Sequence, residues 1–418
     1  MNEIISNKNH RFTPSVFRPK LSELSKKAVL YRVLKQNQIT FTLAGLYIHI
    51  PFCKKACHYC NFHFSTTMRL KDDMLAAIMT EMELQKGYLN SAPIETIYFG
   101  GGTPSVLNVK DLDTLFKKIN SLFAVAESPE ITLEANPDDL NSDYLQDLKN
   151  YTPINRLSIG IQSFSEEDLL WMNRAHNAIE AKMCIEYAQD IGFDNLTVDL
   201  IYGSPTTTDE QWQRNLQTVF DYDIPHISCY ALTIEDGTAL HNFVAKKKTP
   251  SVSEEHQARQ FEILMERMRR NGYLHYEISN FAQPDHFARH NSNYWLGIPY
   301  LGIGPSAHSF DGTSRQWNVA HNPNYIKQLK DNQLPFTKEN LTPEQRYNEY
   351  VMTSLRTIWG CDPSVIGKRF GQKFIKYFNQ KIVEFVQNQT VTTDGKKYFL
   401  TDKGRLLADR IAMELFFE

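Results

Sequence analysis

The sequence predicts an α/β fold, a full or partial β/α barrel followed by a smaller helical domain. From Leu46 to Ile278, short runs rich in β-branched and aromatic residues alternate with longer stretches of helical periodicity, a pattern typical of parallel strands joined by right-handed crossovers. From Leu341 onward, helical stretches and one hairpin signal replace this alternation. Six or more strand–helix units favour a barrel over a flat doubly wound sheet, and a barrel carries its chemistry at the C-terminal ends of its strands.

Seven runs are expected to form strands, and longer stretches between them are expected to form helices. The expected strands are Leu46–Ile50, Ile94–Phe99, Glu130–Ala135, Arg156–Gly160, Leu196–Ile201, Ile227–Ala231 and Leu274–Ile278. The expected helices are Asp72–Gly87, Val109–Phe123, Ser165–Arg174, Glu180–Ile191, Asp209–Asp221 and Glu254–Asn271.

The C-terminal part predicts a winged-helix-like domain. Thr342–Gln345 has the N-cap, the proline and the acidic residue of a helix start, and this helix is expected to reach about Trp359, with two shorter helices after it. Thr390–Thr393 and Lys397–Leu400 flank an Asp-Gly turn and predict a hairpin, and Thr401–Phe417 predicts a final helix. Because winged helices often serve as plain scaffolds, a packing or lid role is expected rather than DNA binding.

Composition and charge indicate an ordinary globular protein of two or three domains. The 418 residues are 42% hydrophobic and 22% charged, which excludes global disorder and a coiled-coil rod. The net charge of −3 gives no indication of a nucleic-acid partner. No apolar run reaches the roughly 18 residues of a membrane span, and Met1–His10 lacks the order of a secretory signal. We therefore expect a cytoplasmic location.

Three segments are expected along the chain: a basic extension over residues 1–43, the barrel over 44–335 and the C-terminal domain over 336–418. The extension holds eight Lys or Arg residues against two Glu residues. Within it, Leu21–Gln36 fits a basic amphipathic helix of the kind that lies on anionic membranes. A solvated tail is the interpretation we favour.

A cysteine triplet follows the first expected strand. Cys53, Cys57 and Cys60 have the spacing C-x₃-C-x₂-C, whereas the other three cysteines are scattered. Zinc would take a fourth protein ligand, for which His58 or His63 is available. A cubane iron–sulfur cluster has four irons, so three thiolates leave one iron open to an exogenous ligand. Taken alone, the triplet favours iron–sulfur over zinc and leaves both open.

The triplet resembles that of the radical SAM superfamily, and a glycine run after the second expected strand agrees. Gly100–Ser105 reads Gly-Gly-Gly-Thr-Pro-Ser, and glycines let backbone groups approach a ligand closely. No Gly-Lys-Ser/Thr follows, so the run is not a P-loop. In the superfamily this turn holds the methionine part of S-adenosylmethionine, whose amino and carboxylate groups bind the open iron.

Polar side chains lie at the ends of later expected strands. Glu134 ends the third strand, Gln162 follows the fourth, and Asp199 lies inside the fifth among apolar neighbours, where a carboxylate is costly unless it has a partner. Arg174 follows the next helical stretch. Acids suit ribose hydroxyls or an ammonium group, and arginine suits a carboxylate.

A closer resemblance covers residues 44–418. They resemble the group that contains oxygen-independent coproporphyrinogen III oxidase and the heme chaperones of the HemW family. The resemblance implies a [4Fe–4S] cluster on Cys53, Cys57 and Cys60. It implies S-adenosyl-L-methionine at Tyr47, Tyr59, Gly101, Gly102, Thr103, Glu134, Gln162, Arg174, Asp199 and Ala231. No catalytic residue is assigned.

Two features separate the members of this group. The oxidase pattern continues with a fourth cysteine two residues after the third, but here Asn61 and Phe62 follow Cys60. Residues 289–295 read Arg-His-Asn-Ser-Asn-Tyr-Trp and resemble the heme-binding motif of the chaperones. The resemblance implies heme contact at His290, Asn291, Tyr294 and Trp295. A neutral imidazole is an iron ligand and aromatic rings pack on a porphyrin, whereas the alternative is a capped loop with a satisfied histidine and two core aromatics.

Three functions follow as hypotheses. The first is a heme chaperone that hands heme to unidentified apoproteins, with the cluster and S-adenosylmethionine in a structural or regulatory role. The second is an oxygen-independent coproporphyrinogen III oxidase, in which a 5′-deoxyadenosyl radical attacks a porphyrinogen propionate; whether the protein is an enzyme stays open, because this signature is incomplete. The third is a zinc-binding barrel. Nucleic acid is not expected as a partner, and peripheral membrane contact and a homodimer stay open.

Overall fold

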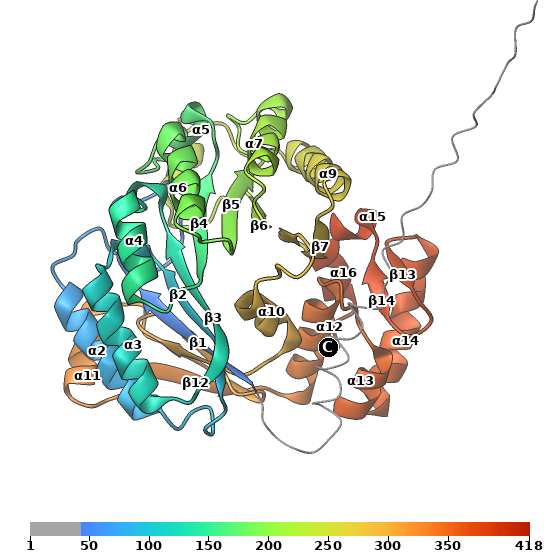
Figure 1. Ribbon diagram of the computed structural model, residues 1–418. Coiled ribbons are helices and arrows are strands. Elements are labelled where there is room, and N and C mark those ends of the chain that lie inside the picture. The colour runs from blue at the N-terminus through green and yellow to red at the C-terminus, as the bar shows by residue number, and fades with distance from the viewer. Residues whose placement is uncertain (1–42) are drawn as a thin grey trace, which may run out of the picture. The chain divides into compact units, whose positions relative to one another are not determined.

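The structure is a computed structural model that describes residues 43–418 (Figure 1). Apart from Leu43, the expected basic extension, including its candidate helix Leu21–Gln36, lies outside the described residues. Within residues 43–418, none of the helices is long and apolar enough to cross a membrane.

A twelve-stranded sheet forms an open barrel, which confirms the partial β/α barrel. The strand order is β12-β11-β10-β9-β1-β2-β3-β4-β5-β6-β8-β7, and no pairing joins β12 to β7 in the part of the chain that the structure describes. Seven neighbouring strands, β9 and β1 to β6, are parallel. They are β1 (Ala44–Ile50), β2 (Ile94–Gly101), β3 (Val125–Ala135), β4 (Arg156–Gln162), β5 (Leu196–Tyr202), β6 (His226–Ala231) and β9 (Tyr300–Ile303).

Helices cover the outer face of these strands (Figure 1). In β1, Leu46, Ile48 and Ile50 are fully buried under the helices, while Tyr47 and His49 alternate with them and point inward. The helices of this part are α2 (Lys71–Gln85), α3 (Val109–Leu122), α4 (Ser142–Tyr151), α5 (Glu166–Trp171), α6 (Ala178–Asp190), α7 (Asp209–Asp221), α8 (Ala239–Ala245), α9 (Glu254–Arg270), α10 (Arg289–Leu296) and α11 (Asn322–Lys330).

The expectation was wrong at two places in the barrel. The run Leu274–Ile278 forms β7 (Leu274–Glu277), but it pairs antiparallel with β8 (Asn280–Ala282). The connection between these two strands is too short for the crossover that parallel pairing requires. The helix expected over Ser165–Arg174 ends at Trp171, since Asn173 takes a left-handed φ of 59°. The sheet also extends beyond β9 through antiparallel β10 (His308–Phe310), β11 (Ser314–Asn318) and β12 (Phe336–Asn340).

The C-terminal part has a second hydrophobic core, built around Tyr347, Phe378 and Leu415. The predicted capping box at Thr342 and the hairpin are confirmed. The helix expected over Thr401–Phe417 is divided at Leu407, whose φ of −120° and ψ of 20° are not helical. The two helices after the first were expected to be shorter than it, but the second of them, with 16 residues, is longer than the first, with 13. A domain boundary at residue 335 stays a prediction. The elements are α12 (Pro343–Leu355), α13 (Pro363–Arg369), α14 (Gln372–Gln387), β13 (Val391–Thr393), β14 (Tyr398–Leu400), α15 (Asp402–Arg405) and α16 (Ala408–Glu414).

Candidate functional site

The cysteine triplet lies in the loop that leaves β1, at the C-terminal end of the parallel strands. Cys53, Cys57 and Cys60 are half-buried free thiols. The Thr103 hydroxyl donates to Cys53 Sγ at 3.3 Å, and a guanidinium nitrogen of Arg174 donates to Cys57 Sγ at 3.1 Å. Burial raises the pKa of Cys53 to about 12 and also raises the pKa of Cys60. These thiols therefore keep their protons at neutral pH, and a metal centre that binds the sulfur atoms displaces the protons.

The glycine turn after β2 passes directly behind the cysteine loop. Gly101 has a φ of 109°, and a Cβ there would lie 2.6 Å from the His49 ring. A Cβ on Gly102 would lie 2.6 Å from the carbonyl oxygen of Phe52, and the Gly102 amide donates to the Ile50 carbonyl at 2.9 Å. The two glycines are thus fixed by packing against the strand that precedes the cysteines.

Replacing Gly102 with alanine is expected to lower the free energy of unfolding by about 2 kcal/mol or more, because the new methyl group meets backbone that cannot move away easily. Urea unfolding measures this change. Gly87→Ala is the matched control, since a Cβ at Gly87 meets nothing within 4 Å. Equal stability of the two variants would contradict the steric argument.

Two half-buried carboxyl groups face the interior next to this turn. Glu134 accepts from the Tyr98 hydroxyl at 2.7 Å and from the Gly101 amide at 3.2 Å. Burial raises the pKa of Glu134 to about 7, and nearby Asp199 adds to the rise. Asp199 accepts from the Ser158 hydroxyl at 3.3 Å, and burial raises its pKa to about 6. Both groups can accept hydrogen bonds from hydroxyl or ammonium groups of a ligand.

Arg174 joins the cysteine loop to the ends of β3 and β4. Its guanidinium donates to Asn136 Oδ1 and to the Gly160 carbonyl, both at 2.6 Å, and to the Tyr59 hydroxyl at 3.5 Å. Its Nε is buried and has no hydrogen-bond partner. An unpartnered buried donor is costly, and Arg174 Nε is therefore free to donate to an acceptor group of a ligand.

The remaining expected residues lie around this centre. Gln162 ends β4 with a φ of 67°, and its side-chain amide is 2.9 Å from a Cβ built on Gly160. Tyr47 points into the barrel, where its hydroxyl meets His49 Nδ1 at 3.1 Å. Ala231 ends β6 beside Tyr202. The hydrogen bond of Tyr47 and the strand pairing of Ala231 do not involve the cysteine loop.

Sequence reasoning missed Asn136, Tyr98 and His49, although all three belong to this site. Asn136 follows β3 directly and Tyr98 alternates inward on β2, so position at a strand end and inward phase are the signals that could have found them. His49 contacts both Tyr47 and Gly101, and its inward phase on β1 is the signal that could have found it.

The motif expected to contact heme forms a helix, α10, on the inner side of the sheet rather than a capped loop (Figure 1). His290 is buried, and its ring nitrogens meet Thr96 Oγ1 and the Tyr294 hydroxyl, both at 2.8 Å. Trp295 lies 5.4 Å from the Arg356 guanidinium of the C-terminal part, and Asn291 is half-buried. Since both imidazole nitrogens have partners, iron ligation by His290 requires one of these bonds to break.

Two family profiles match the chain: the radical SAM superfamily over residues 47–219 and the HemN C-terminal domain over residues 341–407. The heme chaperone HemW of Bacillus subtilis is 31% identical over 372 residues, which are 88% of this chain and 98% of that protein. The heme chaperone HemW of Mycobacterium tuberculosis is 31% identical over 378 residues, 89% of this chain and 94% of that protein. The chain belongs to the HemW family.

The fold of this HemW family member is also found in a solved enzyme. The structure of coproporphyrinogen III oxidase (HemN) from Escherichia coli, a radical SAM enzyme, matches 90% of each chain with a TM-score of 0.78 and 26% identity. The expected resemblance and fold class are thereby confirmed. The two groups share a scaffold, so the difference in function has to lie in particular residues.

The donor set of this HemW family member fits an iron–sulfur cluster. Among residues 43–418, no three His, Cys, Asp or Glu side chains converge as the ligands of one metal ion do. Three thiols on one loop, each free to bind a different iron, suit a cubane. The unpartnered Arg174 Nε and the close glycine turn fit the amino-acid end of S-adenosylmethionine.

The buried imidazole of His290 gives a pH-dependent prediction. Burial, with nearby Arg156, lowers its pKa from 6.5 to about 3, so its neutral form stabilises the fold above pH 6.5 and this contribution is lost as the pH falls toward 3. The excess stability of the wild type over His290→Gln is expected to shrink by about 2 kcal/mol between about pH 7.5 and about pH 5. Urea unfolding at both pH values measures it, and a constant difference would contradict the assigned burial.

Proposed function

We propose that this protein binds heme and transfers it to acceptor apoproteins, and that it carries a [4Fe–4S] cluster and S-adenosylmethionine. The observation that carries the proposal is the match to HemW heme chaperones over almost their whole length. The loop after Cys60 continues with Asn61 and Phe62 and lacks the fourth cysteine of the oxidase pattern, which further favours the chaperone over the oxidase.

Within this proposal, each side chain at the strand ends has a task. Cys53, Cys57 and Cys60 hold three irons, which leaves one iron for the ligand. Arg174 Nε donates to the carboxylate of S-adenosylmethionine, and the turn at Gly101 lets its methionine backbone approach closely. Glu134, Gln162 and Asp199 accept from its ammonium and ribose hydroxyl groups. When bound, the cluster and S-adenosylmethionine supply redox chemistry.

The proposed heme binding rests on α10 and on its contact with the C-terminal helices. Tyr294 and Trp295 offer aromatic surface, and His290 becomes a ligand once its bond to Thr96 or Tyr294 is broken. The acceptor proteins are not identified. We infer a cytoplasmic location, because a cluster held by three cysteine thiolates requires a compartment that keeps thiols reduced.

One experiment separates this function from that of the oxidase. Cluster-loaded protein is incubated anaerobically with coproporphyrinogen III, S-adenosylmethionine and a reductant, and mass spectrometry follows the porphyrin product and 5′-deoxyadenosine. Isothermal titration with heme runs in parallel. Heme binding with an unchanged porphyrinogen is the expected result. Loss of two carboxyl groups from the porphyrinogen, or failure of the cluster-loaded protein to bind heme, would overturn the proposal.

A further inference from the structure

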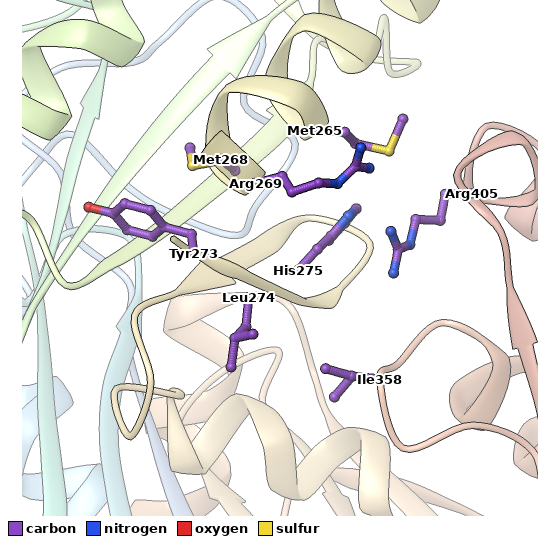
Figure 2. A pocket seen from close by; sticks show the side chains of 8 residues that line it. All are labelled: Met265, Met268, Arg269, Tyr273, Leu274, His275, Ile358 and Arg405. Atoms are coloured by element: carbon purple, nitrogen blue, oxygen red, sulfur yellow. The ribbon is translucent and has the colours of Figure 1, made fainter. Parts of the chain in front are cut away.

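A cavity of about 200 Å³ lies between the barrel and the C-terminal part, away from the cysteine loop (Figure 2). Met265 and Met268 of α9, Leu274 of β7 and Ile358 form its apolar walls. Ile358 is 38% exposed, so an apolar surface continues from the cavity toward solvent. The cavity therefore suits a ligand that is mainly apolar.

Two arginines bring positive charge to the same cavity. Figure 2 shows the guanidinium groups of Arg269 and Arg405 on either side of His275. Both groups pair with a single carboxylate, Asp402 of α15, and Arg405 does so at 2.8 Å. These three side chains carry one net positive charge and leave guanidinium N–H groups for another acceptor. The polar group of a ligand in this cavity is therefore expected to be an anion, which the two guanidinium groups can bind.

His275 adds an unused hydrogen-bond acceptor to the wall. Its Nε2 donates to the Ile278 carbonyl at 3.0 Å, which fixes the tautomer and leaves Nδ1 with a lone pair. That Nδ1 is buried and has no partner. Burial, together with Arg405, lowers the pKa of His275 to about 3, so the ring is neutral. A water that bridges Nδ1 and a bound carboxylate would satisfy both acceptors, because water carries two donors.

We propose that this cavity holds the propionate edge of heme, with Arg269 and Arg405 as the carboxylate partners. The proposal rests on the proposed heme-binding function and adds carboxylate partners to the contacts expected at α10. Heme combines an apolar ring with two carboxylates on one edge, and the cavity combines apolar walls with two guanidinium groups. A volume of about 200 Å³ admits an edge rather than the whole ring, so the ring lies outward over Ile358.

The test uses three probes on the full-length, cluster-loaded protein: heme, metal-free protoporphyrin IX and protoporphyrin IX dimethyl ester. Arg405→Gln and Arg269→Gln are compared with the wild type by isothermal titration. The matched control is Arg270→Gln, because Arg270 is also exposed on α9 but pairs with Glu266. Thermal unfolding checks that the variants fold. If Arg405→Gln is unstable, the Arg269→Gln variant alone tests the site, because Arg269 is exposed.

The expected result is that both variants bind heme and protoporphyrin IX more weakly, by roughly tenfold to hundredfold. The control binds as the wild type does, and affinity for the dimethyl ester does not depend on either arginine. Wild-type affinity for heme in both folded variants would overturn the proposed site. Failure of the wild type to bind heme at all would instead overturn the proposed function, so the two failures are distinguishable.

Discussion

Replacing Cys57 with serine is expected to abolish the iron–sulfur cluster. The site offers three thiols in one loop, and a serine hydroxyl is a much poorer ligand than a thiolate for a soft iron–sulfur centre. The remaining two thiols leave two irons of a cubane without a protein ligand. Iron and sulfide analysis after anaerobic reconstitution is expected to give near-background values for the variant.

Cys184→Ser is the matched control for this experiment. Cys184 is buried in α6 and its thiol donates to the Ala181 carbonyl, a bond that a serine hydroxyl can also make. The control protein is expected to retain the iron and sulfide of the wild type. A Cys57→Ser protein that holds as much iron and sulfide as the control would contradict the assignment of the cluster to this loop.

Replacing Arg174 with glutamine is expected to weaken S-adenosylmethionine binding by roughly tenfold to hundredfold, while the cluster remains. The change removes the unpartnered Nε and the guanidinium bonds to Cys57 and Asn136. Isothermal titration of the cluster-loaded variant measures the affinity. The electron paramagnetic resonance signal of the reduced cluster reports whether the ligand still reaches the open iron.

Two comparisons keep the Arg174 experiment specific. Arg174→Lys retains the charge but not the fork of donors, so an intermediate affinity is expected. Arg214→Gln removes a guanidinium on α7 that bonds to Gln211 and is expected to have no effect. Wild-type affinity and an unchanged signal in Arg174→Gln would contradict the assigned role.

The parallel strands could be predicted because local sequence carries their pattern. Leu46, Ile48 and Ile50 alternate with inward residues in β1, and each strand is followed by a helix long enough for a crossover. The pairing partner is not local, so β7 had the same pattern as its predecessors and yet turns back on β8. Tyr300–Ile303, which forms β9 at the edge of the parallel part, has only 4 residues and is too short for periodicity to indicate a strand.

The site residues also divide into those that local sequence indicates and those that only contacts between distant segments show. The spacing of the cysteines and the glycine run are local, so sequence alone indicated a metal centre with a ligand-binding turn beside it. The contact of Arg174 with Cys57 spans 117 positions, and that of His290 with Thr96 spans 194. Only the fold shows that Arg174 meets Cys57 in the site. It also shows that Thr96 is hydrogen-bonded to an imidazole nitrogen of His290 that was expected to face heme.

Heme transfer tests the central claim most directly. Protein loaded with heme is mixed with a heme-free acceptor hemoprotein at increasing concentrations, and the absorption of the acceptor is followed in time. A chaperone passes heme through a complex with its acceptor, so the rate is predicted to rise with acceptor concentration. A rate that is independent of acceptor concentration, and equal to passive release into solution, would contradict the account.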